Sequence, residues 1–384
     1  MTANCNVFAE LSESACGARS FPVGEERRLV YFEKASGRST TARCWAENPI
    51  EIRNVDAAGR VSSSSGVTRL GESRWALLVP SVLLGALVMM VDQAPMHRWA
   101  VHLVALVMGV ALHFLLLRVP PRPTTFGLVL PLVCLCMMAM TLGAQGLEGV
   151  RRWVSVGPLL VHLSSLLSPL LLVACAMVAR SNTTYSVLLL LSAQAVHMLQ
   201  PDAGQATAFG IAALFAPISV RRSISASVKL VLLVSVCGAW FLPDPLGPMP
   251  FVEDILQRAF SIGILAGSSA LLGLLLYAVS PLCSSTSETR GARIRQMLAS
   301  YFALTAVVTT FGEFPVPLIG YGPSPLIGAF LGIAMLLRAE RVLIAEGSTL
   351  NPGPRDLSND VTFPCAEVLP NKKLLLAATA KGSL

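Results

Sequence analysis

The sequence predicts an all-α integral membrane protein with about ten transmembrane helices and both termini in the cytoplasm. Its 384 residues are 54% hydrophobic and only 13% charged, whereas soluble domains carry roughly 25% charged residues. The charges are also unevenly spread: 19 of the 51 Asp, Glu, Lys and Arg residues lie in 1–74 and 11 in 338–384. This distribution excludes a soluble globular enzyme and isolates a membrane domain between two charged ends.

Ten apolar runs, bounded by charges or by Pro and Gly, are candidate membrane spans. A spanning helix needs about 20 mostly apolar residues. The fifth, sixth and ninth runs are short, so tilt, local thinning of the bilayer or half-helices must make up the difference. In chain order the runs are residues 75–91, 99–117, 125–143, 161–179, 184–199, 206–220, 226–242, 262–282, 297–312 and 326–343.

The Lys and Arg residues of the short loops predict the orientation, because cytoplasmic loops of membrane proteins carry an excess of both. With the N-terminus inside, the inner loops hold nine and the outer loops four, so both termini are expected in the cytoplasm. These residues lie singly or in pairs rather than on one basic face, which argues against a nucleic-acid partner. The inner residues are Arg118, Arg122, Arg180, Arg221, Arg222, Lys229, Arg290, Arg293 and Arg295, and the outer ones Arg98, Arg151, Arg152 and Arg258.

Two charged ends flank the membrane domain, which is expected over 75–343. Residues 1–74 show no sustained helical or strand periodicity, so they are interpreted as a weakly ordered cytoplasmic extension in which Leu29–Phe32 could form one short strand. The tail 344–384 contains several prolines and is interpreted in the same way. The candidate functional residues are therefore expected mainly in the membrane domain.

Four polar clusters lie in or beside the apolar runs. Polar groups near membrane depth are costly, so each is a functional hypothesis by default. On the predicted topology all four fall at outer ends of helices, where they could line one extracytoplasmic cavity. The clusters are residues 149–158, 200–205, 243–261 and 313–325.

The first two clusters suit anion recognition and helix capping. The adjacent guanidiniums of Arg151 and Arg152 offer planar, multi-donor recognition of phosphate or carboxylate, and Trp153 suits the headgroup level. An interfacial anchor is the alternative interpretation. Asp202 follows a helix-breaking Pro, and it can cap the next helix as well as serve in a site.

The other two clusters suit general-base chemistry and a shaped backbone. A carboxylate beside a low-dielectric surface has a raised pKa, and the adjacent Glu253 and Asp254 would also repel each other and push one pKa upward. Solvated acids on a short interfacial helix are the alternative. The Pro- and Gly-rich segment 313–325 prohibits a regular helix, and it forms either a re-entrant cavity wall or a structural turn.

No metal site is predicted. The histidines of the apolar runs lack ligand-like spacing, so they are interpreted as buried core residues. These histidines are His102, His113, His162 and His197.

Taken in order along ten helices, the clusters resemble the SEDS family (shape, elongation, division and sporulation). The family has an Arg-Arg-Trp stretch before helix four, Gln-Pro-Asp-x-Gly-Thr after helix five, an acidic outer loop before helix eight, and a Tyr-Gly-Gly-Ser-Ser turn before helix ten. This chain has Arg-Arg-Trp-Val-Ser-Val-Gly at 151–157 and Gln-Pro-Asp-Ala-Gly at 200–204. Its last turn, Pro-Leu-Ile-Gly-Tyr-Gly-Pro-Ser-Pro at 317–325, keeps Tyr321 and Ser324.

The resemblance implies a peptidoglycan glycosyltransferase of the bacterial cytoplasmic membrane. Such proteins polymerise the lipid-linked disaccharide precursor, lipid II, on the outer face during division or elongation, usually with a class B penicillin-binding protein. Arg151 and Arg152 would hold the pyrophosphate, and Glu253 or Asp254 would activate the incoming hydroxyl. The family makes a divalent cation conceivable, but the residues indicate no particular cofactor. The remaining substrate-binding residues implied are Trp153, Asp202, Tyr321 and Ser324.

The chain departs from the family in helix four. The family's Gln-Pro-Ser-Glu-Leu-x-Lys is replaced by His-Leu-Ser-Ser-Leu-Leu-Ser at 162–168, so Ser165 and Ser168 stand where the family has Glu and Lys. Losing both members of an intramembrane charged pair is expected once the pair is not needed. A catalytically impaired scaffold or regulator of the division or elongation machinery therefore stays open as an alternative. A ten-helix bundle with broken helices and polar cavity residues could also move an amphipathic substrate, so a flippase or transporter of the lipid-linked precursor is the second alternative.

Overall fold

The computed structural model describes residues 73–119, 125–146, 148–157, 159–217, 225–283 and 289–350, and the backbone of four strands before residue 56. The rest of the predicted extension over 1–74, and the tail from residue 351, lie outside the described residues. Their degree of order stays a prediction.

The four N-terminal strands form an antiparallel sheet in chain order. The strand predicted at Leu29–Phe32 lies inside the second of them, and Phe32 pairs with Ala18 and Thr41 on either side. The strands are β1 (Ala18–Val23), β2 (Arg27–Phe32), β3 (Thr40–Cys44) and β4 (Arg53–Val55).

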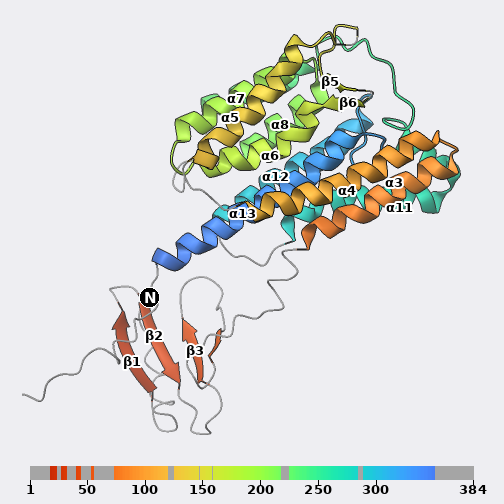
Figure 1. Ribbon diagram of the computed structural model, residues 1–384. Helices are drawn as coiled ribbons and strands as arrows, with labels where there is room; N and C mark the ends of the chain where they lie inside the picture. The colour runs from red at the N-terminus through yellow and green to blue at the C-terminus, as the bar shows by residue number, and fades with distance from the viewer. Residues whose placement is uncertain are drawn as a thin grey trace, which may run out of the picture. The chain divides into compact units, whose positions relative to one another are not determined.

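Each of the ten predicted spans coincides with a helix (Figure 1), which confirms the all-α membrane class. These helices are η1 with α3 (Arg74–Leu78, Val79–Val91), α4 (Met96–Arg118), α5 (Thr125–Met140), α6 (Leu163–Val178), α7 (Thr183–Leu199), α8 (Ala203–Leu214), α9 (Ala226–Ala239), α11 (Ile264–Val279), α12 (Thr289–Val307) and α13 (Pro323–Leu350). Shorter elements are η2 (Thr141–Gly143), α10 (Ile255–Ile262), η3 (Ser280–Leu282) and η4 (Val308–Thr310).

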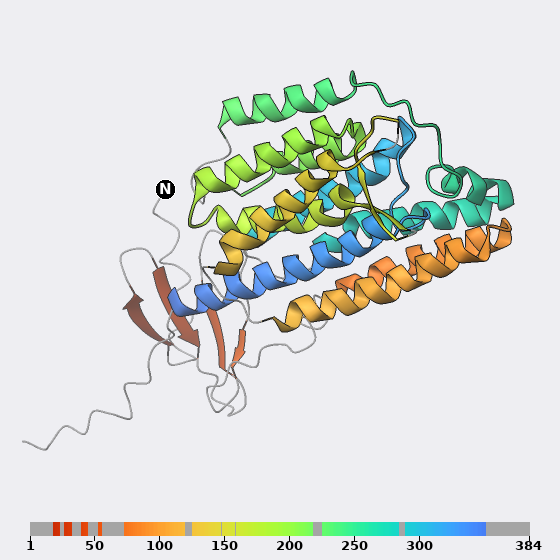
Figure 2. The ribbon, with the colours of Figure 1, turned by 45° about the horizontal axis from the view of Figure 1, so that its top comes forward.

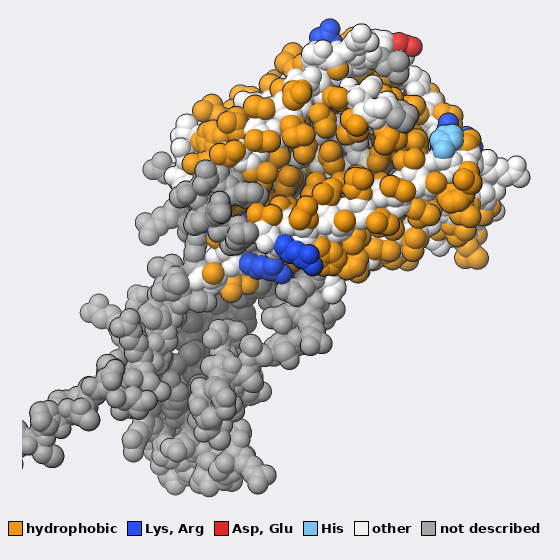
Figure 3. All heavy atoms as spheres, in the orientation of Figure 1, with side chains coloured by type: hydrophobic (Ala, Val, Ile, Leu, Met, Phe, Trp, Pro, Cys, Tyr) orange, Lys and Arg blue, Asp and Glu red, His pale blue; other side chains and the backbone are white. Residues whose placement is uncertain are grey.

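The surface of the helical region is that of a membrane protein. Three described segments, Arg74–Val91, Met96–Arg118 and Ile264–Leu282, are long and apolar enough to cross a bilayer by themselves. The helices lie roughly along one direction, with α3 and α4 as an antiparallel pair (Figure 2). Hydrophobic side chains cover most of the visible helical surface (Figure 3), and Leu265, for example, is 82% exposed. Such a continuous apolar surface requires a lipid or protein cover.

A β-hairpin precedes α6, where the sequence predicted that the fourth span would begin at residue 161. Strands β5 (Trp153–Val156) and β6 (Leu159–His162) pair antiparallel, with Trp153 opposite His162. Gly157 has a φ of 60° in the connecting turn, a conformation that Gly adopts without a steric penalty. The β-branched and apolar residues of both strands favour the hairpin over an earlier helix start. Its effect is to place the residues before Trp153 beside the first turn of α6.

The first turns of α6 and α13 approach each other closely at Gly328. A Cβ atom there would collide with the carbonyl oxygens of Ser165 and Leu166. The missing side chain therefore lets the start of α13 reach the start of α6. As a result the hydroxyl of Ser324 accepts a hydrogen bond from the backbone N–H of His162 at 2.9 Å.

A buried ion triad joins three elements. Glu340 of α13 accepts from Arg74 of η1 at 2.6 Å through one carboxylate oxygen and from Arg295 of α12 at 2.9 Å through the other. The exposed fractions of Arg74, Glu340 and Arg295 are 2%, 5% and 7%. Glu340 lies sixteen residues after Ser324 on the same helix, which is about 24 Å at 1.5 Å per residue.

Candidate functional site

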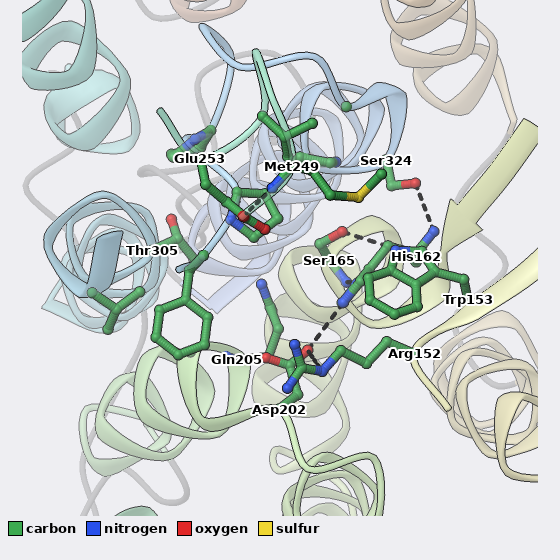
Figure 4. Close-up of a pocket in the computed structure, with 18 of the residues that line it drawn as sticks. Arg152, Trp153, His162, Ser165, Asp202, Gln205, Met249, Glu253, Thr305 and Ser324 are labelled. Carbon is green, nitrogen blue, oxygen red and sulfur yellow. Dashed lines mark hydrogen bonds and ion pairs between the residues drawn. The ribbon is translucent and has the colours of Figure 1, made fainter. Parts of the chain in front are cut away.

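One cavity of about 280 Å³ receives side chains from all four polar clusters (Figure 4). The hairpin β5–β6, the starts of α8 and α13, and the loops before α10 and α13 surround it. The cluster residues that line it include Arg152, Trp153, Asp202, Gln205, Asp244, Glu253, Glu313, Tyr321 and Ser324.

Arg152 is buried at the edge of this cavity, with acceptors around its guanidinium. Nη2 donates to the Asp244 carboxylate at 2.6 Å and to the backbone carbonyl of Pro201, while Nε lies 3.4 Å from the carbonyl of Gln200. The Asp202 carboxylate is 4.0 Å from Nε. The guanidinium is therefore rigidly held and largely neutralised by protein groups.

Asp202 caps α8, as the sequence suggested, and it also pairs within the site. Its Oδ1 accepts from the backbone N–H of Gln205 at 3.0 Å, and its Oδ2 lies 3.0 Å from Nε2 of His162. Burial alone would raise the pKa of Asp202, but Arg152 and His162 outweigh that effect and hold the pKa below its usual range. The carboxylate is thus kept ionised, so it can orient the Arg152 guanidinium and the His162 ring.

His162 connects the site elements, although the sequence suggested a plain core histidine. Its Nδ1 accepts from the backbone N–H of Ser165 and caps α6. Nε2 therefore carries the proton that faces Asp202. The ring also packs edge-on against Trp153 at a centroid distance of 5.7 Å. Since both ring nitrogens are engaged, His162 acts as a positioning residue.

Glu253 is the cavity acid best suited to take a proton. The carboxylate accepts from the backbone N–H of Met249 at 2.7 Å. Burial raises the pKa of Glu253 to about 7, and the nearby carboxylates of Glu313 and Asp244 act in the same direction. A general base is most effective when its pKa lies near the working pH.

Two backbone hydrogen bonds hold the Glu253 loop against the loop before α13. Val316 donates to the carbonyl of Val252 at 3.0 Å, and Tyr321 donates to the carbonyl of Phe251 at 2.6 Å. These bonds join the third and fourth clusters, and so bring Glu253 and Tyr321 to one cavity.

The structure places two predicted site residues outside the described lining. Asp254 binds the backbone N–H of Phe251 and the guanidinium of Arg258, which also pairs with Asp92. Arg151 is exposed and donates to the carbonyl of Leu142. Of the two pairs of neighbouring candidates, Arg151 with Arg152 and Glu253 with Asp254, it is therefore Arg152 and Glu253 that line the cavity.

The helix-borne wall of the cavity is polar but uncharged. Tyr301 of α12 donates to the side-chain oxygen of Gln205 at 2.7 Å, and the hydroxyls of Tyr277 and Thr305 lie 3.1 Å apart. Ser165, which stands where the SEDS pattern has Glu, lines the same wall. No three His, Cys, Asp or Glu side chains in the described part of the chain are grouped so as to hold a metal ion.

The fold and site define a polytopic membrane protein with a polar cavity at one end of its bundle. No family model and no curated protein matches the sequence. Among solved structures, the rod shape determining protein RodA of Thermus thermophilus matches with a TM-score of 0.55 and 22% identity, over 70% of this chain and 96% of RodA. A variant of that protein with an Asp replaced by Ala matches with a TM-score of 0.56 and 23% identity, over 70% of this chain and 96% of the variant.

A further match has a TM-score of 0.44 and 20% identity over 70% of this chain and 97% of the other, and is described as a peptidoglycan synthase complex that coordinates polymerization and crosslinking. The RodA likeness confirms the SEDS-type fold predicted from the order of the clusters.

Replacing Asp202 by Asn is expected to destabilise the protein by about 2 kcal/mol at pH 7. Asn keeps the cap on α8 but removes the charge that faces Arg152 and His162. Because the folded-state pKa is depressed, this stability is present above the unfolded pKa of about 3.9 and is lost as the pH falls toward the folded value. Thermal unfolding of the two proteins from pH 7 to pH 3 measures it.

Asp92→Asn is the matched control, since Asp92 makes a partly exposed pair with Arg258 and the loss of a solvent-screened pair costs less. Equal melting temperatures for Asp202→Asn and wild type at pH 7 would contradict the assigned role.

Proposed function

We propose that this protein is a glycosyltransferase of bacterial cell-wall synthesis that polymerises a disaccharide carried on a lipid diphosphate. The single observation that carries the proposal is Glu253, a half-buried cavity carboxylate whose pKa is raised to about 7. The SEDS-type fold, shared with a rod shape determining protein, supports a role in the cell wall. The apolar helices support a multi-pass location in the cytoplasmic membrane.

Sugar transfer requires one proton acceptor and one place for negative charge. Glu253 takes the proton of the acceptor hydroxyl, and the oxygen attacks the anomeric carbon of the donor sugar. The bond from that carbon to the diphosphate oxygen breaks, and the lipid diphosphate leaves with the electron pair. Among the described residues that line the cavity, Arg152 is the one Lys or Arg, so its guanidinium is placed to stabilise the negative charge of the leaving group.

Polymerisation by the purified full-length protein tests the proposal. We expect glycan chains from lipid II in detergent or nanodiscs, resolved by gel electrophoresis, with higher yield when a class B penicillin-binding protein from the same organism is present. Absence of polymer with every such partner, at pH 8 and with divalent cation supplied, would refute a transferase.

A non-catalytic scaffold is the second candidate, and one feature of the site favours it. Asp244 and the carbonyls of Pro201 and Gln200 already accept from the Arg152 guanidinium. Complementation of a strain that lacks this protein, with the wild type or with Glu253→Gln, separates the two functions. A scaffold is expected to restore growth or shape with Glu253→Gln in place, whereas a transferase is not.

A further inference from the structure

The cavity has two walls of different chemistry. Its loop-borne wall carries the carboxylates of Asp244, Glu253 and Glu313. Its helix-borne wall carries uncharged polar groups from four helices, and two of the phenols are almost fully buried. These groups are Ser165 of α6, Gln205 of α8, Tyr277 of α11, and Tyr301 and Thr305 of α12. Apart from Arg152, His162 and Asp202, which also line the cavity, a ligand therefore meets acids on one side and neutral hydrogen-bonding groups on the other.

Gln205 is fixed on the helix-borne wall and extends into the cavity (Figure 4). Its backbone N–H donates to Asp202 at 3.0 Å, and its Oε1 accepts from the Tyr301 hydroxyl at 2.7 Å. With Oε1 engaged, the Nε2 donor group is left for the cavity, and none of the described residues accepts a hydrogen bond from it. The amide is thus pre-oriented toward a ligand acceptor.

The surrounding charges favour a neutral acceptor over an anionic one. An anion at Nε2 would lie near the ionised Asp202 and opposite the acidic wall, and Arg152, the one Lys or Arg among the described lining residues, is the group that the proposed mechanism assigns to the leaving diphosphate. A buried neutral wall also disfavours an unpaired charge. Carbonyl and hydroxyl oxygens carry no such penalty.

We propose that Gln205 is a specificity-determining residue that donates a hydrogen bond to a neutral oxygen of the ligand's sugar, a hydroxyl or an acetamido carbonyl. The inference rests on the proposed function and adds the group of the substrate that this wall recognises. A sugar offers several oxygens to the polar groups of the wall. A site built to hydrogen-bond a substrate group discriminates strongly against an analogue that lacks it.

Two probes test the assignment by binding alone: a polyprenyl diphosphate that carries an N-acetylated disaccharide, and the same polyprenyl diphosphate without sugar. Dissociation constants are measured on the full-length protein in nanodiscs. The wild type is expected to bind the sugar-bearing lipid at least about tenfold more tightly. Gln205→Glu is expected to reduce that ratio by about tenfold, because Glu keeps the acceptor for Tyr301 and loses the donor.

Gln257→Glu is the matched control, since Gln257 is exposed on α10 and lies outside the described lining. Its ratio should equal that of the wild type. The ratio cancels any general repulsion of the diphosphate by the added charge. Tyr301→Phe, which removes the group that orients the amide, should also lower the ratio, and it provides a second variant if Gln205→Glu does not fold.

An unchanged ratio in both folded variants, or tighter binding of the sugar-free lipid by the wild type, would overturn the assignment. The result is independent of turnover. If the ratio of the two dissociation constants depends on Gln205 but the protein makes no polymer, the subsite assignment stands and only the transferase proposal fails. If the wild type polymerises normally but the ratio is unchanged in the variants, the transferase proposal stands and the subsite assignment fails.

Discussion

Glu253→Gln is expected to abolish glycan polymerisation, with a rate loss of about 10²- to 10⁴-fold, which is typical for a general acid or base. Gln retains the size of the side chain and an oxygen that can accept from the backbone N–H of Met249. The loop should therefore keep its conformation while the proton acceptor disappears. Initial rates with labelled lipid II, measured beside the wild type at pH 8, give the effect directly.

The pH dependence distinguishes a base from a structural acid at position 253. Burial raises the pKa of Glu253 to about 7 from its ordinary value of 4.5. The wild-type rate should therefore rise as the pH increases through about 7, because the ionised form is the base. A rate that is flat from pH 5.5 to pH 8.5 would remove Glu253 from that role.

Stability should change in the opposite direction. Because the folded-state pKa is raised, the stabilising contribution of Glu253 is fully present below about pH 4.5 and is lost as the pH rises through about 7. Glu253→Gln should then melt at a higher temperature than the wild type at pH 8, with a much smaller difference at pH 4.5. Asp254→Asn is the control: it removes one acceptor of the Arg258 guanidinium and should retain polymerisation.

The helices were predictable because membrane spans depend on local composition. The ten apolar runs need no knowledge of distant contacts, and each one coincides with a helix. The hairpin before α6 was not predicted, since Trp153–Val156 and Leu159–His162 are apolar and lie against a predicted span. Only their pairing across Gly157 separates them from the helix, and short apolar runs alone do not distinguish strand from helix.

The candidate site was predictable where its residues sit at helix ends. Asp202 and Ser324 belong to breaks between apolar runs, and such breaks meet at the ends of a bundle. His162 was missed because its partners, Asp202 and Ser324, are distant in the sequence. The available signal was its position at the start of the departure from the SEDS pattern, five residues after Gly157. Between Arg151 and Arg152, only the turn of the backbone before β5 decides which guanidinium is buried.

The largest stability effect is expected for Glu340→Gln in the buried ion triad. The change removes the carboxylate charge that Arg74 and Arg295 both bind, and both arginines are more than nine-tenths buried. Breaking a buried ion pair by removing one partner costs about 3–5 kcal/mol, because the remaining charge is desolvated and uncompensated. The triad joins η1, α12 and α13, so the loss should lower the cooperative melting temperature of the whole bundle, measured in detergent.

A second variant separates the cost of a charge left buried after loss of its partner from the loss of the triad contacts themselves. Replacing Arg74 and Glu340 together by Met removes one charge of each sign, so it should be less destabilising than Glu340→Gln alone, since only one of the two arginines then stays buried after the loss of the Glu340 carboxylate. Glu148→Gln is the matched control, because Glu148 is exposed and its loss should change the melting temperature little. If Glu340→Gln melts at the same temperature as Glu148→Gln, or if the double variant is less stable than Glu340→Gln, the charge balance of the triad does not govern the stability of this end of the bundle.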